Sequence, residues 1–577
     1  MKKILYILAV VTLYTLNGCV KLDREIITTL SSKEVNYQYG YTSGRATALY
    51  SDLPTGFMEI DGAMFASMGD EAEHTLETSD IQVFNVGSWN ASTNPDNVWA
   101  KYYKSIRNVN LFLATSDSVN LEGYRLDPTP SQQIIYNTRM AEIKRWKYEG
   151  RFLRAFYYFE LVKRYGGIPI IKNVYTIGDD VTDVQRNSLQ ECVQYISDEC
   201  DSAALQLPVK YPDTELGRAT KGAALALKAK VLLYAASDLW NTASWAGGYA
   251  QPQLISLPVA DRNVRWKAAA DAAKAVIDLT GTTYALYNNY RNLFITGESF
   301  KNMEHIFVRR AGASNSFEAA NWSVGYDGGK SGTTPSQNLV DAYEVKVSAT
   351  SAVTFNWSDP THAANPYATS GATARDPRLQ LNVIVNNTTY KSRIVELWTG
   401  GKDGKGKDLV SKTGYYLKKY LDEALNLQTN TTSIHGWSLI RLADVYLWYA
   451  EALNEYSPGN ADIKIYVDKV RTRSGIAMPP VPAGLTQVLM RDVIRHERQV
   501  ELAFEGHRVW DLRRWMLAPA VLGTPLKGVE ITQTTPGIFT YNVIKVEDRV
   551  FEPKMYFYPI PQQEMLKMPS WIQNPLW

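Results

Sequence analysis

Three glutamates near the end of the chain have the residue type and the spacing that could perform acid–base chemistry. Glu497, Glu501 and Glu505 follow one another at intervals of four residues, which places them on one side of an α-helix. Two carboxyl groups at a defined separation can cleave a glycosidic bond. Like charges at this spacing also repel one another, so the same pattern requires cationic partners.

Arginines close to these glutamates could be those partners. Arg498 and Arg508 stand three residues from Glu501 and Glu505. The same segment holds three more arginines, Arg495, Arg513 and Arg514. A guanidinium group binds a carboxylate bidentately and keeps it ionised, whereas a catalytic acid must hold its proton near neutral pH. The sequence therefore favours a half-buried ion-pair network, with a paired-carboxylate glycosidase site as the alternative.

A helix must present these side chains, and the apolar residues predict its inward face. Val493, Val500 and Phe504 repeat at seven- and four-residue steps, on one stripe of a helix. Similar periodicity and end signals predict further helices elsewhere in the chain. These cover residues 43–50, 96–112, 132–165, 189–207, 221–237, 264–279, 437–456 and 461–474.

Several motifs along the chain are similar to those of one protein family. The segments FEGHR at 504–508 and DLRRW at 511–515 resemble the C-terminal signature of the SusD/RagB family of outer-membrane nutrient-binding lipoproteins. Other matching segments are YGGIP at 165–169, GRAT at 217–220, VRTRSG at 470–475 and YPIP at 558–561. Their order along the chain agrees with the family, which implies a SusD-like fold, mostly α, with a tetratricopeptide-like helix-pair scaffold, long loops and a few short strands.

The N-terminus has the features of an export signal. Lys2 and Lys3 precede an apolar run at 4–16 that is too short to span a bilayer. The run ends at Leu16-Asn17-Gly18-Cys19, which resembles a bacterial lipobox. We expect residues 1–18 to be removed and Cys19 to carry lipid, because acyl chains anchor a protein to a membrane. An ordinary cleavage site beside a chance cysteine is the alternative.

The remaining composition predicts one globular domain over residues 19–577. No low-complexity run divides the chain. A formal net charge of +2 without basic blocks gives no support for nucleic-acid binding. Cys192 and Cys200 would lie about 12 Å apart on one helix, too far for a disulfide. The histidines show no metal-ligand spacing, so we expect no metal and no cofactor.

Helical periodicity lapses in residues 280–436, which predicts a loop-rich functional region with a few strands, such as one at 378–385. No nucleophile elbow, zinc-protease motif or dinucleotide fingerprint occurs. The segment GYDGGKS at 325–331 is one residue short of a phosphate-binding loop. These observations favour a binding protein over an enzyme.

Aromatic residues among small and polar ones are the candidate ligand site. The chain contains 15 Trp and 36 Tyr, and Trp89, Trp322 and Tyr326 lie among Gly, Ser and Asn. Exposed aromatic rings suit the C–H faces of sugars, while neighbouring polar groups bind the hydroxyls. Loop packing is the alternative for each ring. By resemblance, the site would also include Asn90, Asp70 and Glu71.

The resemblance implies a function for this site. Such a protein would capture a polysaccharide or oligosaccharide at the cell surface, held to the outer membrane by its lipid. It would then pass the glycan to a SusC-like TonB-dependent transporter, on which it sits as a lid. A surface glycoside hydrolase and a peptide-binding member of the same family are the alternatives.

Overall fold

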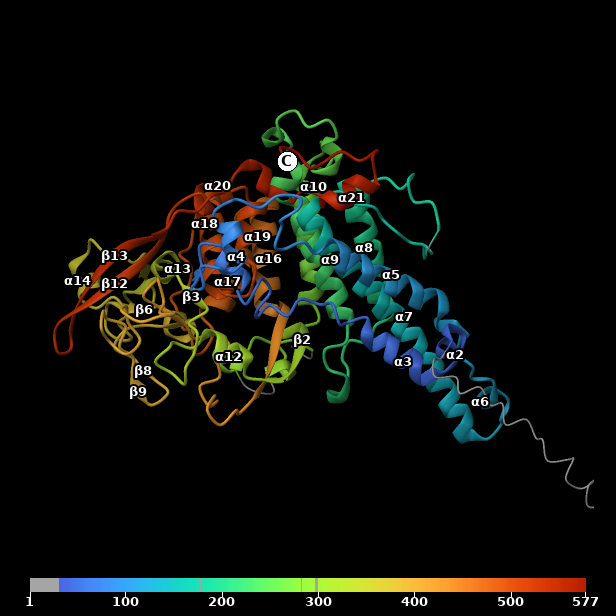
Figure 1. Ribbon diagram of the computed structural model, residues 1–577, viewed down its shortest axis with the longest axis horizontal. Helices are drawn as coiled ribbons and strands as arrows, with labels where there is room; N and C mark the ends of the chain where they lie inside the picture. Colours follow the sequence, from blue (N-terminus) through green and yellow to red (C-terminus); the bar gives the residue numbers. More distant parts are fainter. Residues whose placement is uncertain (1–30, 177, 282, 296–298) are drawn as a thin grey trace, which may run out of the picture.

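The computed structural model describes residues 31–176, 178–281, 283–295 and 299–577. The predicted signal segment 1–18 and Cys19 lie outside these residues. Among the helices described, none is long and apolar enough to cross a membrane. Helices form most of one half of the molecule, and short elements, loops and a β-hairpin form the other (Figure 1).

Long helices that pack in sequence order form the scaffold. α7 packs on α8, α8 on α9, α9 on α10, and α10 on α16, while α5 covers α7, and α17 and α18 cover α16. Their bounds are α5 Trp99–Thr115, α7 Pro130–Tyr165, α8 Leu189–Gln206, α9 Lys221–Ala236, α10 Arg262–Ile277, α16 Leu442–Tyr456, α17 Ala461–Arg471 and α18 Gln487–Glu501. This arrangement confirms the predicted mostly α fold, with helix pairs stacked side by side.

Local sequence explains where these helices begin and how closely they pack. Ser188 and Glu191 form a reciprocal capping box at the start of α8. The hydroxyl of Thr220 accepts a hydrogen bond from the backbone N–H of Ala223 and caps α9. Within α9, a Cβ at Gly222 would lie 2.1 Å from the Tyr284 hydroxyl oxygen. Only glycine therefore admits the tyrosine at this contact.

Short helices connect or flank the scaffold. They are α2 Ser32–Tyr37, α3 Tyr39–Ala48, α4 Ile81–Asn85, α6 Glu122–Leu126, α11 Asn292–Ile295, α12 Ser316–Asn321, α13 Gln337–Ala342, α14 Pro360–Ala364, α15 Arg378–Asn382, α19 Arg508–Arg514, α20 Ala518–Leu522 and α21 Gln562–Lys567. Residues 280–436 contain only such helices and strands of ten residues or fewer within their described part.

The strands pair in small antiparallel sheets. β2 pairs with β11, β12 with β13, β1 with β3, β7 with β10, β8 with β9, and β4 lies between β5 and β6. Their bounds are β1 Ala72–His74, β2 His305–Ser314, β3 Thr333–Pro335, β4 Val345–Lys346, β5 Ala352–Val353, β6 Ala374–Arg375, β7 Val383–Ile384, β8 Thr389–Tyr390, β9 Arg393–Ile394, β10 Tyr416–Leu417, β11 Ser433–Arg441, β12 Leu526–Thr535 and β13 Ile538–Glu547.

Three predicted elements differ in the structure. Residues 437–441, predicted as helix, end strand β11 instead. Residues 378–385, predicted as a strand, form helix α15 and then the two-residue strand β7. Helix α18 ends at Glu501, and Phe504 lies in the turn beyond it with a φ of +63°. Phe504 is therefore buried by the turn and not by the stripe of the helix.

Candidate functional site

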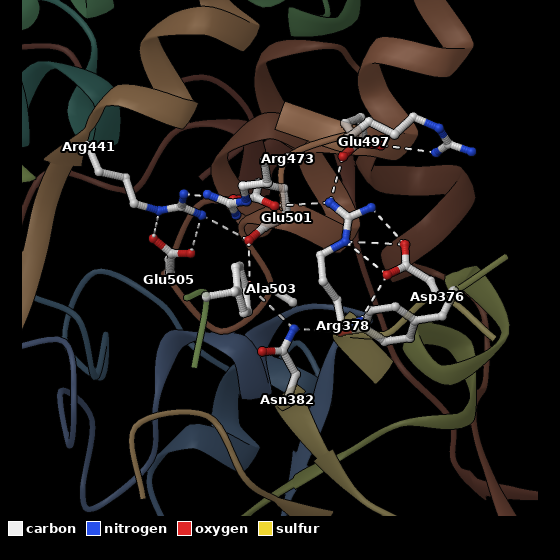
Figure 2. A network of polar contacts seen from close by, with 12 residues as sticks. Asp376, Arg378, Asn382, Arg441, Arg473, Glu497, Glu501, Ala503 and Glu505 are labelled. Carbon is white, nitrogen blue, oxygen red and sulfur yellow. Dashed lines mark hydrogen bonds and ion pairs between the residues drawn. The ribbon is translucent and has the colours of Figure 1, made fainter. Parts of the chain in front are cut away.

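The glutamate triplet lies at the centre of a buried ion-pair network between α18 and the loop-rich half (Figure 2). Glu501 is fully buried and shared by three arginines. Arg441 Nη1 lies 2.7 Å from Glu501 Oε1, and Arg378 Nη1 lies 2.9 Å from Glu501 Oε2. Arg473 also pairs with this carboxylate. The network predicted from the sequence is confirmed, and it is fully buried.

The two other glutamates bind neighbouring cations of the same network. The Glu505 carboxylate forms ion pairs with Arg441 Nε and Lys419 Nζ, each at an N–O distance of 2.7 Å. The Glu497 carboxylate forms ion pairs with Arg378 and Arg471, at N–O distances of 2.5 and 3.1 Å. The partners come from β11, α15, α17, the turn after α17 and the segment after β10, so they join segments that lie far apart in the sequence.

The predicted partners of the triplet are wrong. Arg498 pairs with Asp444 and Asp511. The other nearby arginines also face away from the triplet. Arg508 binds Asp70, Arg514 binds Glu451 and Asp511, Arg513 donates to the Met555 carbonyl, and Arg495 covers the ring of Trp515. Arg495 and Arg498 lie on the same helix as Glu497 and Glu501 but point to other partners, so nearness in the sequence did not predict the pairing.

The electrostatics of the network disfavour acid catalysis by these glutamates. Burial alone would raise the pKa of Glu501, but Arg473, Arg441 and Arg378 lower it to about 2. The same balance lowers the pKa of Glu505, through Arg441 and Lys419. A glycosidase acid needs a raised pKa and contact with substrate. The pKa of Glu501 is lowered instead. Its side chain has no exposed surface, so it does not reach a substrate.

The prediction that Trp322 and Tyr326 are exposed rings is wrong. Trp322 is fully buried, its Nε1–H donates to the Tyr390 hydroxyl at 2.9 Å, and Lys391 Nζ covers the ring at 3.6 Å from its centroid. Tyr326 is 5% exposed, with the Arg393 guanidinium 3.7 Å above its ring. Neither ring offers a free face to a sugar.

Trp89 is also buried, with 2% of its surface exposed. Its ring packs among Phe84, Tyr558 and Trp577, at centroid separations of 4.7–5.0 Å. The neighbouring Asn90 is exposed, and its Oδ1 accepts a hydrogen bond from the Ser92 backbone N–H at 2.8 Å. Trp89 therefore belongs to the core, and its ring has no exposed face on which a sugar could stack.

The predicted acidic residues have structural partners. Asp70 binds Arg508 bidentately at 2.8 Å. Glu71 is 1% exposed, and its Oε1 accepts a hydrogen bond from the Phe504 backbone N–H at 3.3 Å. Burial and the charge of Asp70 raise the pKa of Glu71 to about 8, against the opposing effect of Arg508. These carboxyl groups brace the turn at 502–507.

The core tryptophans were predicted correctly, whereas the half-buried ones were missed. Trp99, Trp146, Trp448 and Trp510 are all buried. In the described part of the chain, the tryptophans with partly exposed side chains are Trp245, Trp357, Trp398 and Trp577. Two of them, Trp357 and Trp398, lie beside the β12–β13 hairpin. The alternation of apolar and polar residues over 539–543 is the sequence signal that could have revealed this hairpin.

Thiol and metal chemistry have little support among the described residues. Cys192 and Cys200 are buried free thiols. No group of three or more His, Cys, Asp and Glu side chains in the described ranges could hold a metal ion.

Comparisons with known proteins agree with this fold. The model of the SusD family matches residues 301–577, and a model described as "Starch-binding associating with outer membrane" matches residues 58–233. SusD-like protein P2 of Formosa agariphila is 23% identical over 529 residues, which cover 89% of this chain and 91% of the relative.

Solved structures resemble the chain over nearly its whole length. A SusD-like protein from Bacteroides fragilis has a TM-score of 0.77 at 24% identity, covering 95% of this chain and 99% of its own. A SusD-like carbohydrate-binding protein from the same species has a TM-score of 0.73 at 24% identity. The match covers 93% of this chain and 99% of that protein's chain. With these family models matching residues 58–233 and 301–577, the chain belongs to the SusD/RagB family.

Proposed function

We propose that this protein is a surface lipoprotein that binds a polysaccharide or oligosaccharide and delivers it to a TonB-dependent transporter of the outer membrane. The observation that carries the proposal is the family match, because one matching model is described as starch-binding and one similar solved structure as a carbohydrate-binding protein. The buried Glu501 and Glu505, whose pKa values are lowered by their cationic partners, also fit a binding protein better than a hydrolase.

A binding panel tests the first part of this proposal. The purified protein is run on gels that contain amylose, laminarin, xylan or alginate, and the retained glycans are titrated by calorimetry. We expect retention by at least one glycan with a Kd in the micromolar to millimolar range, about −4 to −8 kcal/mol. Release of new reducing ends would favour the hydrolase. Binding of casein peptides without any glycan would favour the peptide-binding alternative.

The lipid anchor is tested by the substitution Cys19→Ser. We expect this variant to leave the membrane fraction while its folded body keeps its melting temperature, because acyl chains and not packing would hold it there. The strain should lack the transporter, so that this partner cannot retain the protein. Cys192→Ser, at a buried thiol, should stay with the membrane. A Cys19→Ser protein that also stays there would contradict the lipoprotein assignment.

Delivery to a transporter predicts a stable complex in the outer membrane. Mild detergent extraction followed by affinity purification of the tagged chain should recover a barrel protein of the SusC type. A tagged wild-type chain recovered from the outer membrane without any barrel protein would contradict this part of the proposal and leave the glycan-binding part intact.

A further inference from the structure

Arg513, near the end of α19, is a buried cation that forms no ion pair with a carboxylate in the described part of the chain. Only 4% of its surface is exposed. Its Nε–H donates to the Met555 carbonyl at 3.3 Å, and its Nη1 donates to the Val509 carbonyl at 3.1 Å. A guanidinium group has five N–H donors. Its second terminal nitrogen, Nη2, therefore has no acceptor among the described residues.

Arg375 shows what a buried arginine needs when no carboxylate binds it. Each of its three nitrogens donates to a backbone carbonyl, from Tyr343, Pro366 or Val340. Arg513 lacks such a set. Asp96 is the carboxylate whose charge acts most on Arg513, but it forms its ion pair with Arg164 at 2.7 Å. Burial lowers the pKa of Arg513, as expected where a charge has too little compensation.

Arg513 lines a cavity with an empty volume of about 300 Å³. The other charged residue in the cavity wall is Arg549, and no Asp or Glu side chain of the described residues lines it. Arg549 already binds Glu73 and Glu547. Apart from Asn85, the remaining lining side chains are apolar or aromatic. The cavity wall therefore carries a positive charge that no neighbouring group of the protein neutralises.

Asn85 presents an unpaired oxygen to the same cavity. Its side chain is buried, and its Oδ1 has no hydrogen-bond partner. The orientation of this amide is fixed by a chain of donors, because Asn85 Nδ2 donates to Gln82 Oε1 at 3.1 Å and Gln82 Nε2 donates to Glu73 Oε1 at 2.9 Å. A buried acceptor without a partner costs free energy. An occupant of the cavity must therefore offer a donor to Asn85 and negative charge to Arg513.

We propose that this cavity binds a small anion that carries a hydroxyl group, of which hydrogencarbonate is the simplest. Its charged oxygens would accept hydrogen bonds from Arg513 Nη2, and its hydroxyl would donate to Asn85 Oδ1. Charge-assisted hydrogen bonds of this kind are shorter and stronger than neutral ones. The site joins α4, α19 and the segment at 549–555, and it does not depend on the proposed glycan-binding function.

Thermal unfolding with added anions tests the site. The purified protein is heated at pH 8 in sodium chloride, with part of the salt replaced by 100 mM sodium hydrogencarbonate or 100 mM sodium formate. For a Kd of about 1 mM, we expect hydrogencarbonate to raise the Tm of wild type by about 2 °C. Formate should raise it less, because it has the charge but no hydroxyl to donate to Asn85.

Three variants locate the effect in the cavity. Arg513→Met removes the charge and should abolish the shift in Tm. Asn85→Leu removes the acceptor and should make hydrogencarbonate no better than formate. Arg375→Met, at the buried arginine that backbone carbonyls satisfy, should keep the wild-type shift. Crystals of wild type soaked in sodium hydrogencarbonate should show a planar group of three oxygens beside Arg513.

Each other result overturns part or all of the proposal. A wild-type Tm that hydrogencarbonate leaves unchanged, or a shift that persists in Arg513→Met, would reject the site. Equal shifts by formate and hydrogencarbonate in wild type would reject the hydroxyl-bearing class of anion. Should Arg513→Met fail to fold, the soaked crystals decide, and a single water in place of the planar group would show that the cavity does not bind the anion.

Discussion

Replacing Glu501 with alanine is expected to destabilise the folded protein by about 3–5 kcal/mol, because a buried charge would lose its partner. Arg441, Arg473 and Arg378 all contact this carboxylate, and none of their side chains is more than 2% exposed. Without it, three guanidinium groups would share the remaining acidic groups in a dry environment. The free energy of unfolding is measured by urea denaturation at pH 7.

Two further variants define what this result means. Glu501→Gln keeps the shape of the side chain and removes the charge, so it should lose nearly as much stability as Glu501→Ala if charge pairing dominates. Glu122→Ala removes the partner of Arg125 in an exposed ion pair, where solvent screens both charges, and we expect no measurable change. Equal denaturation midpoints for Glu501→Ala and wild type would show that the network does not stabilise the fold.

The ion-pair network shows what sequence spacing can and cannot predict. Four-residue spacing placed Glu497 and Glu501 together on α18, because that inference uses only helix geometry. Glu505 lies beyond the end of this helix and joins the network through the turn that follows. Spacing could not identify Arg441 and Arg378, which stand 60 and 123 residues from Glu501. Partners at such distances are set by the packing of β11 and α15 against α18, which no local pattern encodes.

The aromatic residues show why a composition rule failed. Trp322 lies among Gly, Ser and Asn, a setting that predicts an exposed loop, yet it is fully buried. A Cβ at Gly329 would lie 2.3 Å from the Trp322 carbonyl oxygen, so this glycine permits the backbone to fold closely around the tryptophan. Small residues near a large ring can thus indicate tight packing instead of exposure.

Short elements were predicted less well than long helices, because a periodic pattern needs many residues to be recognised. The helices of the scaffold have several turns, so their periodicity averages over many residues. Residues 378–382 and 437–441 are too short for that, and their structure follows from the neighbouring segments. The same limit applies to the β12–β13 hairpin, because apolar and polar residues alternate there over only five positions, 539–543.

Glu71 illustrates a buried carboxyl group that the sequence presented as a ligand-binding residue. Its side chain is 1% exposed, beside the ion pair of Asp70 and Arg508. Burial is the largest cause of its raised pKa, and the negative charge of Asp70 adds to it. A carboxyl group in this position is more stable when protonated, so it links the stability of the fold to pH.

The substitution Glu71→Gln is therefore expected to stabilise the protein at alkaline pH and not at acidic pH. The pKa of Glu71 is about 8 in the folded protein, against 4.5 for an ordinary glutamate in the unfolded chain. Since the folded pKa is the higher one, its stabilising contribution is complete below pH 4.5 and is lost as the pH rises to 8. A difference of this size corresponds to about 5 kcal/mol.

Glutamine keeps the oxygen that accepts the hydrogen bond from Phe504 and cannot ionise, so the variant should not share this loss. Urea denaturation at pH 4.5, 6 and 8 measures the difference in stability between Glu71→Gln and wild type. The new amide can change the free energy of unfolding by the same amount at every pH without affecting the test. The test is how the difference in stability between Glu71→Gln and wild type changes with pH. Glu77→Gln, at an exposed carboxylate, controls for general effects of charge. A difference between Glu71→Gln and wild type that stays the same from pH 4.5 to 8 would mean that Glu71 titrates alike in the folded and unfolded chain, and hence that its surroundings do not hold it in the neutral form.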